Sequence, residues 1–299
     1  MPFGMGADAA TPGYKALWLP DQPVANQATH LGMEQQDLSL GVPLWKDGPD
    51  GVVFSTRVRW EIFQTGAILP DSQRPFPADL WNVAFGTSYF HRFDNGNVGG
   101  ASVNLGSASD QPFHSFQEDT ASVSGFLRVP QGEHNAWLFT LMFSTNGQLG
   151  DIPIPGVAYF YAPSDAFQAT IGFPFATLKY QPSENWRFEL SYALITSVHA
   201  RAIYQPVKWL DCYAGFDWLN ESYLLVDRPE EKDRFFYYEK RLSAGLKFKL
   251  PEHVTLDFSA GYAFDRYYFE GTTFTLTGGT DRVDVDAGPF VAAQLQARF

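Results

Sequence analysis

Hydrophobic and polar residues alternate along most of this chain with a period of two. In residues 52–63, for example, Val52, Phe54 and Trp60 share one parity, whereas Arg57 falls on the other. A β-strand directs successive side chains to opposite faces, so each such segment predicts a strand with one apolar and one polar face. The pattern recurs in about fourteen segments, and twelve or sixteen strands are also compatible with it because boundaries read from one sequence are imprecise.

The last of these segments ends the chain on an aromatic residue. Within residues 286–299 one parity is apolar and includes Val291, Ala293, Leu295, Ala297 and Phe299. The ending resembles the C-terminal strand of bacterial outer-membrane β-barrels, which commonly finish in Phe with apolar residues at every second position before it. That resemblance implies that these residues form an assembly signal for the barrel-assembly machinery.

The two faces of the predicted strands differ in kind. The apolar parity is aromatic and branched, whereas the other parity mixes Gly, Ser and Ala with full charges. Such a mixture is typical of the crowded, polar interior of a barrel rather than the outer face of a soluble sandwich. We therefore predict an all-β fold, a single antiparallel up-and-down transmembrane β-barrel over residues 33–299. Residues 1–32 are rich in Pro, Gly and Ala, and we expect an irregular segment that is either an exposed tail or a lumen plug.

Many charged residues fall on the parity predicted to face the lumen. They are Arg57, Arg59, Glu61, Arg92, Arg128, Arg187, Glu189, His199, Arg201, Asp211, Asp217, Glu239, Arg241, Lys247, Asp257, Asp265 and Arg298. One interpretation is a water-filled or gated lumen whose charges bias which solutes pass. The other is a network of mutually paired charges that fills and rigidifies the lumen.

Tryptophan prefers a membrane interface because its ring is apolar and its N–H is polar. If the chain ends on the periplasmic side, counting strands backwards places four tryptophans near periplasmic strand ends: Trp60, Trp81, Trp186 and Trp209. Three lie nearer the outer ends: Trp45, Trp137 and Trp218. Two girdles are the expected arrangement, although aromatic residues also prefer strands in general. The same count puts two long connections, 65–79 and 108–117, on the periplasmic side, which a miscounted strand near Gly172 would explain.

Composition agrees with a barrel and argues against other classes. Aromatic residues make up 16% of the chain, charged residues 18%, and the mean hydropathy is -0.20. No run of about eighteen apolar residues predicts a transmembrane helix, and a barrel needs none, since only alternate residues face lipid. The formal charge of -12 argues against a nucleic-acid partner. Cys212 is the single cysteine and cannot form an internal disulfide. Residues 1–20 do not read as a signal peptide, so we expect a mature chain or a truncated gene model.

Catalytic and metal-binding patterns are weak. Ser197 and His199 are close in sequence, but no third residue that would orient the histidine is evident, and we interpret the pair as a polar turn rather than a lipase site. Asp281, Asp284 and Asp286 lack the Gly and Glu spacing of a Ca²⁺ loop. The six histidines show no ligand spacing. We therefore expect no enzyme activity, no cofactor and no metal.

Two segments, 80–96 (LWNVAFGTSYFHRFDNG) and 155–180 (PGVAYFYAPSDAFQATIGFPFATLKY), resemble an uncharacterised family of predicted outer-membrane β-barrel proteins. The resemblance covers roughly residues 33–299 and implies an integral outer-membrane protein in contact with its lipids, with no known substrate. We expect a porin-like channel for passive or selective diffusion of small solutes. The alternatives are a closed structural or interaction barrel, or an importer of hydrophobic small molecules, which a lateral opening near Gly172–Pro174 would favour.

Overall fold

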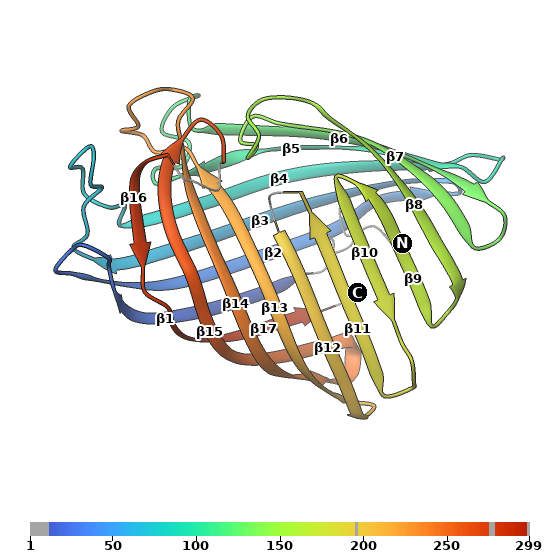
Figure 1. Ribbon diagram of the computed structural model, residues 1–299. Helices are drawn as coiled ribbons and strands as arrows, with labels where there is room; N and C mark the ends of the chain where they lie inside the picture. The colour runs from blue at the N-terminus through green and yellow to red at the C-terminus, as the bar shows by residue number, and fades with distance from the viewer. Residues whose placement is uncertain (1–11, 195–196, 275–278, 298–299) are drawn as a thin grey trace.

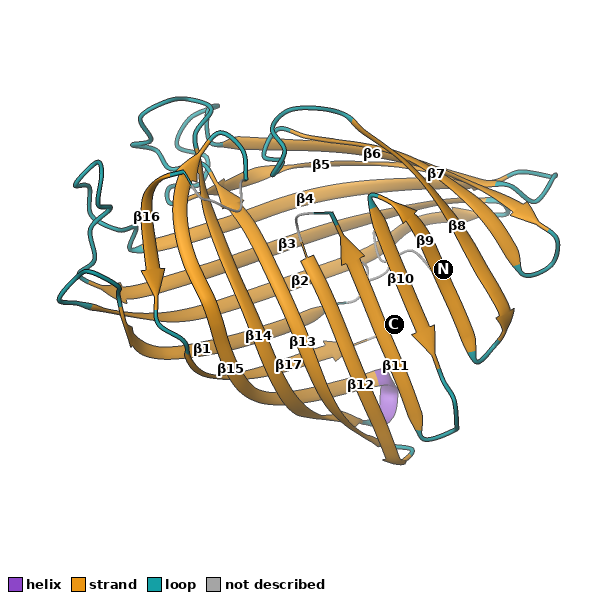
Figure 2. Ribbon diagram, viewed as in Figure 1, coloured by secondary structure: helices purple, strands orange, loops and turns teal. Residues whose placement is uncertain are grey.

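The computed structural model describes residues 12–194, 197–274 and 279–297, and most of them lie in antiparallel strands (Figures 1 and 2). A single turn of 3-10 helix, η1 (Pro251–His253), precedes β15. Among the residues described, no helix is long and apolar enough to cross a membrane. The strands are β1 (Gly13–Pro23), β2 (His30–Asp47), β3 (Asp50–Thr65), β4 (Asp79–Arg92), β5 (Val98–Ser109), β6 (Asp119–Gln131), β7 (Asn135–Ser144), β8 (Ile154–Ser164), β9 (Phe167–Phe173), β10 (Phe175–Tyr180), β11 (Trp186–Ala193), β12 (Ser197–Val207), β13 (Leu210–Tyr223), β14 (Arg234–Lys249), β15 (Val254–Gly271), β16 (Thr280–Val285) and β17 (Gly288–Ala297).

The strands form one closed sheet in which each strand from β1 to β15 pairs antiparallel with the next one along the chain. β1 pairs with both β2 and β17, so no open edge remains there. β15 pairs with β16 near one end and with β17 along the rest, so these two strands share one position in the wall. Seventeen strands with one shared position give a closed sixteen-stranded barrel. The predicted class is confirmed, and the strand number is sixteen rather than about fourteen.

The prediction of an irregular segment over residues 1–32 was wrong for Gly13–Pro23, which form β1. The period of two is present there, with Trp18 exposed on the outer face and Leu17 buried inside. Prolines around the segment obscured it, because proline removes a donor from the strand ladder. The barrel therefore begins at Gly13 rather than at residue 33, and His30, Leu31 and Gly32 already belong to β2. Residues 1–11, also part of the predicted plug or tail, lie outside the described residues.

Residues 167–180 predicted one strand with a bulge, but they form two strands, β9 and β10, that meet at Pro174. Because strand directions were counted backwards from the C-terminus, one extra strand here reverses the direction predicted for every strand that precedes it in the chain. We call the end that carries Gly13 and Ala297 the terminal end, and the opposite end the loop end. The long connections 66–78 and 110–118 lie at the loop end (Figure 1), which removes the inconsistency in the predicted strand directions.

The same reversal changes the barrel end that the sequence analysis assigned to four tryptophans. Trp45 and Trp137 lie at the terminal end, whereas Trp60 and Trp81 lie toward the loop end, where their rings stack with centroids 4.7 Å apart. The others keep the ends assigned to them, because they follow the extra strand: Trp186 and Trp209 at the terminal end, and Trp218 toward the loop end. Trp18, which the sequence analysis did not consider, lies halfway along β1.

Apolar side chains cover the outer face of the wall. Leu44, Leu141 and Ile171 are exposed to 62%, 55% and 69%, and each belongs to the outward parity of its strand. Exposed apolar surface spread over most strands far exceeds the patches that a monomer in water ordinarily leaves uncovered. The wall therefore has an apolar outside and a polar inside.

Disulfide cross-linking should show that β1 closes the barrel. Ala16 and Ala293 are register partners on β1 and β17. Register partners in antiparallel strands lie about 4.5–5.5 Å apart at their Cα atoms, within the range of a disulfide. In a Cys212→Ser background, Ala16→Cys with Ala293→Cys should cross-link on mild oxidation, measured by non-reducing electrophoresis.

The matched control pairs Ala16→Cys with Ala297→Cys, which is displaced by four residues, or roughly 13 Å, along β17. This pair should not cross-link. Equal cross-linking of both pairs, or of neither, would contradict the register of β1.

Candidate functional site

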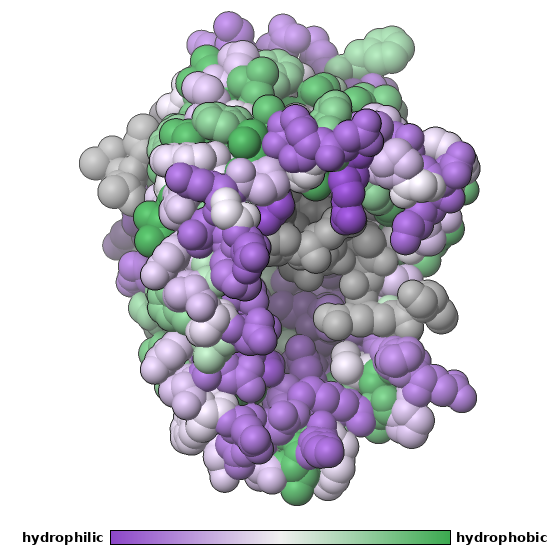
Figure 3. Space-filling view, turned by 90° about the vertical axis from the view of Figure 1, so that its right-hand side faces the viewer, coloured by the Kyte–Doolittle hydropathy of each residue, from purple (hydrophilic) through white to green (hydrophobic). Residues whose placement is uncertain are grey.

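The site that this fold offers is the lumen. Figure 3 looks at the terminal end and shows hydrophilic residues gathered around a hollow. Because the outward parity is occupied by apolar residues, charged side chains of the same strands point into this enclosed space. The lumen is therefore where the chain concentrates its polar chemistry.

The predicted lumen residues fall into groups along the barrel. Side chains of β3 and β14 toward the loop end include Arg57, Arg59, Glu61, Glu239 and Arg241. His199, Arg201 and Asp217 form a second group on β12 and β13. A third lies toward the terminal end and comprises Arg187, Glu189, Asp211, Lys247 and Asp257. Arg92 and Arg128 occupy the inward parity of β4 and β6, and within the described ranges no ion pair involves them.

Glu239 is the centre of the first group. It is fully enclosed, and the hydroxyl of Tyr237 donates to its Oε2 at 2.6 Å. The guanidinium of Arg266 lies 3.1 Å from the same oxygen, and Arg241 donates to Oε1. A carboxylate taken out of water needs several such partners to remain charged. This part of the lumen is therefore a paired network, as one of the two interpretations predicts.

An ion pair ties opposite walls together. Asp37 on β2 accepts hydrogen bonds from Arg57 at 3.0 Å and from Arg59 at 2.9 Å. Arg59 also pairs with Glu221 on β13, a strand that is not its neighbour in the sheet. The lumen is therefore narrow enough at this level for side chains to meet across it.

The second group contains a contact that the sequence did not reveal. Asp217 Oδ1 lies 2.7 Å from His199 Nδ1, so a residue 18 positions away orients the histidine. The other carboxylate oxygen accepts from Arg201 at 2.9 Å. These three side chains form an ion network between β12 and β13.

Asp265, predicted to face the lumen, does not. A bulge interrupts the pairing of β14 with β15, and Asp265 has a left-handed φ of 49°. Its carboxylate lies 2.8 Å from Lys240 on the outward parity, and Arg266 takes the inward place. One extra residue in a strand exchanges the faces of all that follow, which strict alternation cannot anticipate.

Other functional residues were missed or cannot be placed. Lys15 and Arg266 line the lumen, but the first belongs to the unpredicted β1 and the second follows the bulge. On β17, Val291 and Leu295 are exposed on the outer face, and the role of this strand in assembly remains a prediction. Arg298 and Phe299 lie outside the described residues.

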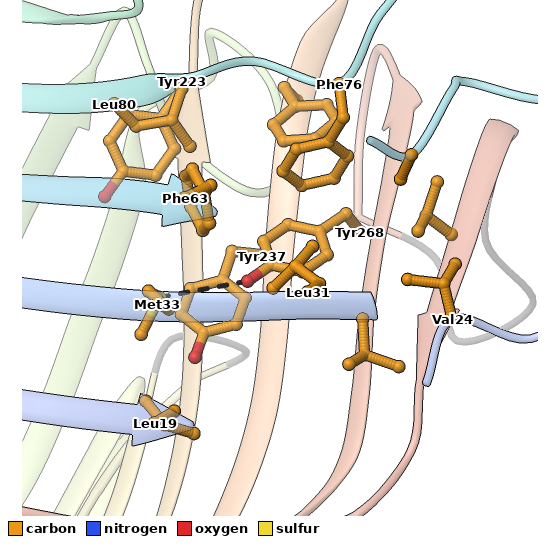
Figure 4. Close-up of a cluster of buried hydrophobic side chains, with 14 of the residues drawn as sticks. Leu19, Val24, Leu31, Met33, Phe63, Phe76, Leu80, Tyr223, Tyr237 and Tyr268 are labelled. Carbon is orange, nitrogen blue, oxygen red and sulfur yellow. Dashed lines mark hydrogen bonds between the residues drawn. The ribbon is translucent and has the colours of Figure 1, made fainter. Parts of the chain in front are cut away.

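An apolar cluster fills one side of the lumen at the loop end, the side lined by β1 to β5 and β13 to β17 (Figure 4). Leu31 and Met33 reach it from β2, Phe63 from β3 and Tyr268 from β15. β15 is separated from β2 in the sheet by β17 and β1, so these side chains meet inside the lumen. Phe76, from the connection 66–78, packs edge-on against Tyr268 with centroids 4.9 Å apart. The four strand residues lie on the inward parity of their strands, where small and charged side chains were expected.

A first latch holds the connection 66–78 over the apolar cluster. Arg74 lies 2.7 Å from Asp227 and 2.5 Å from Glu270. The carboxylate of Asp281 accepts from the backbone N–H groups of Asp71 and Ser72, each at 2.8 Å. Three separate parts of the chain thereby fix one connection.

A second latch joins the connections 224–233 and 110–118. The side chains of Arg228 and Glu118 pair at 3.0 Å and are nearly buried, at 4% and 2% exposure. The N–H of Leu224 also donates to the carbonyl of Ala108 at 2.7 Å. Burial alone would raise the pKa of Glu118, but hydrogen bonds from Ser115 and Arg228 outweigh burial and hold this pKa below 4.5. The loop end is therefore closed where β13 to β15 face β1 to β5.

Neither the family models nor the curated proteins include a match to this chain, so the resemblance to an uncharacterised family finds no matching model. Among solved structures, the deltaS2 mutant of the monoaromatic hydrocarbon channel TodX is 9% identical with a TM-score of 0.42, covering 97% of this chain and 90% of that one. An outer membrane channel from Pseudomonas putida F1 is 10% identical with a TM-score of 0.41, covering 97% and 95%. OccK7 (OpdD) from Pseudomonas aeruginosa is 10% identical with a TM-score of 0.40, covering 95% and 98%. At such values the likeness carries no functional information for this chain.

Removing one member of the second latch should open it. Arg228→Ala leaves Glu118 buried without its ionic partner, which ordinarily costs about 3–5 kcal/mol. Amide hydrogen exchange in the connection 224–233 should accelerate strongly at pH 7, measured by mass spectrometry. The control Lys232→Ala, an exposed residue of the same connection, should leave exchange unchanged.

The same latch should depend on pH. The pKa of Glu118 is lower in the folded state than its ordinary 4.5, so its contribution is present above pH 4.5 and is lost as the pH falls through the folded pKa. Exchange corrected for its intrinsic rate should therefore rise in the wild type below about pH 4.5, and much less in Arg228→Ala. A flat wild-type profile would contradict this role for Glu118.

Proposed function

We propose that this protein is a channel of the bacterial outer membrane that passes small polar solutes through its lumen, with the apolar cluster as its gate. The observation that carries the proposal is the division of the wall into an apolar outside and a charged inside. Only a closed barrel satisfies the backbone of such a sheet in lipid, because hydrocarbon provides no hydrogen-bonding partner. The tryptophans near both ends of the strands support a membrane-spanning orientation.

The loop end argues for a selective channel rather than a wide pore. Sixteen-stranded porins leave an aqueous passage, whereas here the apolar cluster and two latches occupy one side of the loop end. Passage on that side requires the connection 66–78 to move. Arg74 is the residue on which this movement would depend, since it joins the connection to Asp227 and Glu270.

A second candidate is import of hydrophobic molecules through the wall. β9, β10 and β11 contain 7, 6 and 8 residues. A tilted transmembrane strand needs about 9–11 residues to cross the hydrocarbon core. The three strands around Pro174 are therefore shorter than a membrane-spanning strand needs to be, and Ile171 and Phe173 are exposed beside this proline. A closed structural barrel is the third possibility, and the ion network around Glu239 favours it.

Proteoliposome assays separate the three candidates. Swelling in a small sugar supports the channel. Uptake of a neutral aromatic compound without sugar flux supports import through the wall at these short strands. If folded protein gives neither result, the barrel is closed and the proposed channel is wrong.

Loosening the gate should raise conductance. Phe76 is 5% exposed in the apolar cluster, so Phe76→Ser places a hydroxyl there and removes the ring contacts with Tyr268. Single-channel conductance in a planar bilayer should increase several-fold over the wild type. Phe116→Ser is the matched control, because Phe116 is 94% exposed in another connection at the loop end. Equal conductance of Phe76→Ser and the wild type would exclude the cluster as the gate.

A further inference from the structure

A cavity of about 160 Å³ adjoins the apolar cluster on the side of the terminal end, and its charged lining residues are mostly cationic. Four cations line it, Lys15, Arg201, Arg241 and Lys247, against two carboxylates, Asp217 and Asp257. This balance is opposite to that of the whole chain, which carries a net charge of -12. The positive sign is therefore a property of this place and not of the composition.

The two carboxylates are already engaged by other groups. Asp217 accepts from Arg201 at 2.9 Å and contacts His199 at 2.7 Å. Asp257 accepts from the Tyr213 hydroxyl at 2.7 Å, while the ammonium group of Lys247 is more distant, at 3.7 Å. Arg201 is thus paired with Asp217 and Lys247, at the longer distance, with Asp257, while Arg241 pairs with Glu239 beside the cavity. Both carboxylates of the lining therefore already have a cationic partner.

Lys15 is the remaining cation of this lining. It lies on the inward parity of β1, and within residues 12–194, 197–274 and 279–297 no hydrogen bond or ion pair reaches its ammonium group. An ammonium group that is partly withdrawn from water is stabilised by an anion close to it. Lys15 and the loosely held Lys247 together give the cavity an unused capacity for one negative charge.

The remaining lining is apolar on one side. Leu17 and Phe290 belong both to this cavity and to the apolar cluster that adjoins it. The guanidinium of Arg241 stands 5.5 Å from the centroid of the Phe290 ring. A ligand that suits this site therefore has an anionic head toward Lys15 and a small apolar body toward Phe290.

We propose that this cavity binds a small organic anion, a carboxylate on an aromatic or branched aliphatic body. That the bound anion is in transit through the barrel rests on the proposed channel function. Binding itself does not, because it requires only the folded barrel. The site then selects anionic over cationic solutes of equal size.

Titration calorimetry on the detergent-folded protein tests the site with benzoate as the probe and benzylamine as its cationic counterpart of similar size. Benzoate should bind and benzylamine should not. Lys15→Gln should weaken benzoate binding at least about tenfold, the effect of losing one charge-assisted hydrogen bond. Lys247→Gln should weaken it in the same direction.

Lys179→Gln is the matched control. Lys179 occupies the inward parity of β10, outside the cavity, so this substitution removes the same charge from the lumen without touching the site. It should leave benzoate affinity unchanged. Gel migration before and after heating confirms that each variant is folded, and Lys247→Gln provides the test if Lys15→Gln does not fold.

The site is refuted if benzoate does not bind to the folded wild type, if benzylamine binds equally well, or if Lys179→Gln weakens benzoate as much as Lys15→Gln does. Proteoliposomes distinguish this failure from failure of the channel. Sugar flux without benzoate binding removes the site and keeps the channel. Benzoate binding without any solute flux keeps the site and removes the channel.

Discussion

Closure of the sheet by β1 is the constraint on which the rest of this structure depends. Its backbone pairs on one side with β17, from Gly13 with Gln296, and on the other with β2, from Gly13 with Ser39. In hydrocarbon an unpaired strand edge would leave backbone groups without partners, so a wall lacking β1 could not remain in a membrane. The same strand carries Lys15 and Leu17 inward, so closing the wall also completes the interior.

A closed wall forces inward side chains to satisfy one another or to hold water. The lumen does so in two ways within a short distance. The carboxylate of Glu239 contacts the Tyr237 hydroxyl and the guanidinium groups of Arg241 and Arg266. Arg59 pairs across the lumen with Glu221, so these charges near the loop end are paired. Nearer the loop end, Met33 on β2 and Tyr268 on β15, strands separated in the sheet by β1 and β17, meet in the apolar cluster and exclude water. Buried ion pairs recover little net stability after desolvation, so what the Arg59–Glu221 pair adds is a direct link between β3 and β13, which are not neighbours in the sheet.

Alternation in the sequence predicted the class of fold and the direction of most side chains, because a period of two is imposed by strand geometry. It failed where a local feature interrupts that geometry. Pro174 separates two strands that read as one, and the bulge at Asp265 exchanges faces within β15. It also failed for Met33 and Phe63, since parity gives the direction of a side chain but not what it meets there. Contacts across the lumen depend on the barrel's closure, which no single segment encodes.

The strands of the wall differ in length, and this difference relates the proposed gate to the proposed anion cavity. β2, β3, β14 and β15 contain 18, 16, 16 and 18 residues, about twice the length of β9 to β11, and the apolar cluster forms between these long strands. Leu17 and Phe290 lie in both the cluster and the cavity that adjoins it. A ligand that packs against Phe290 in the proposed anion cavity would therefore contact the apolar cluster directly. Because a close-packed cluster does not deform continuously, such a ligand would shift the proposed gate only if it fits one packing of the cluster better than another.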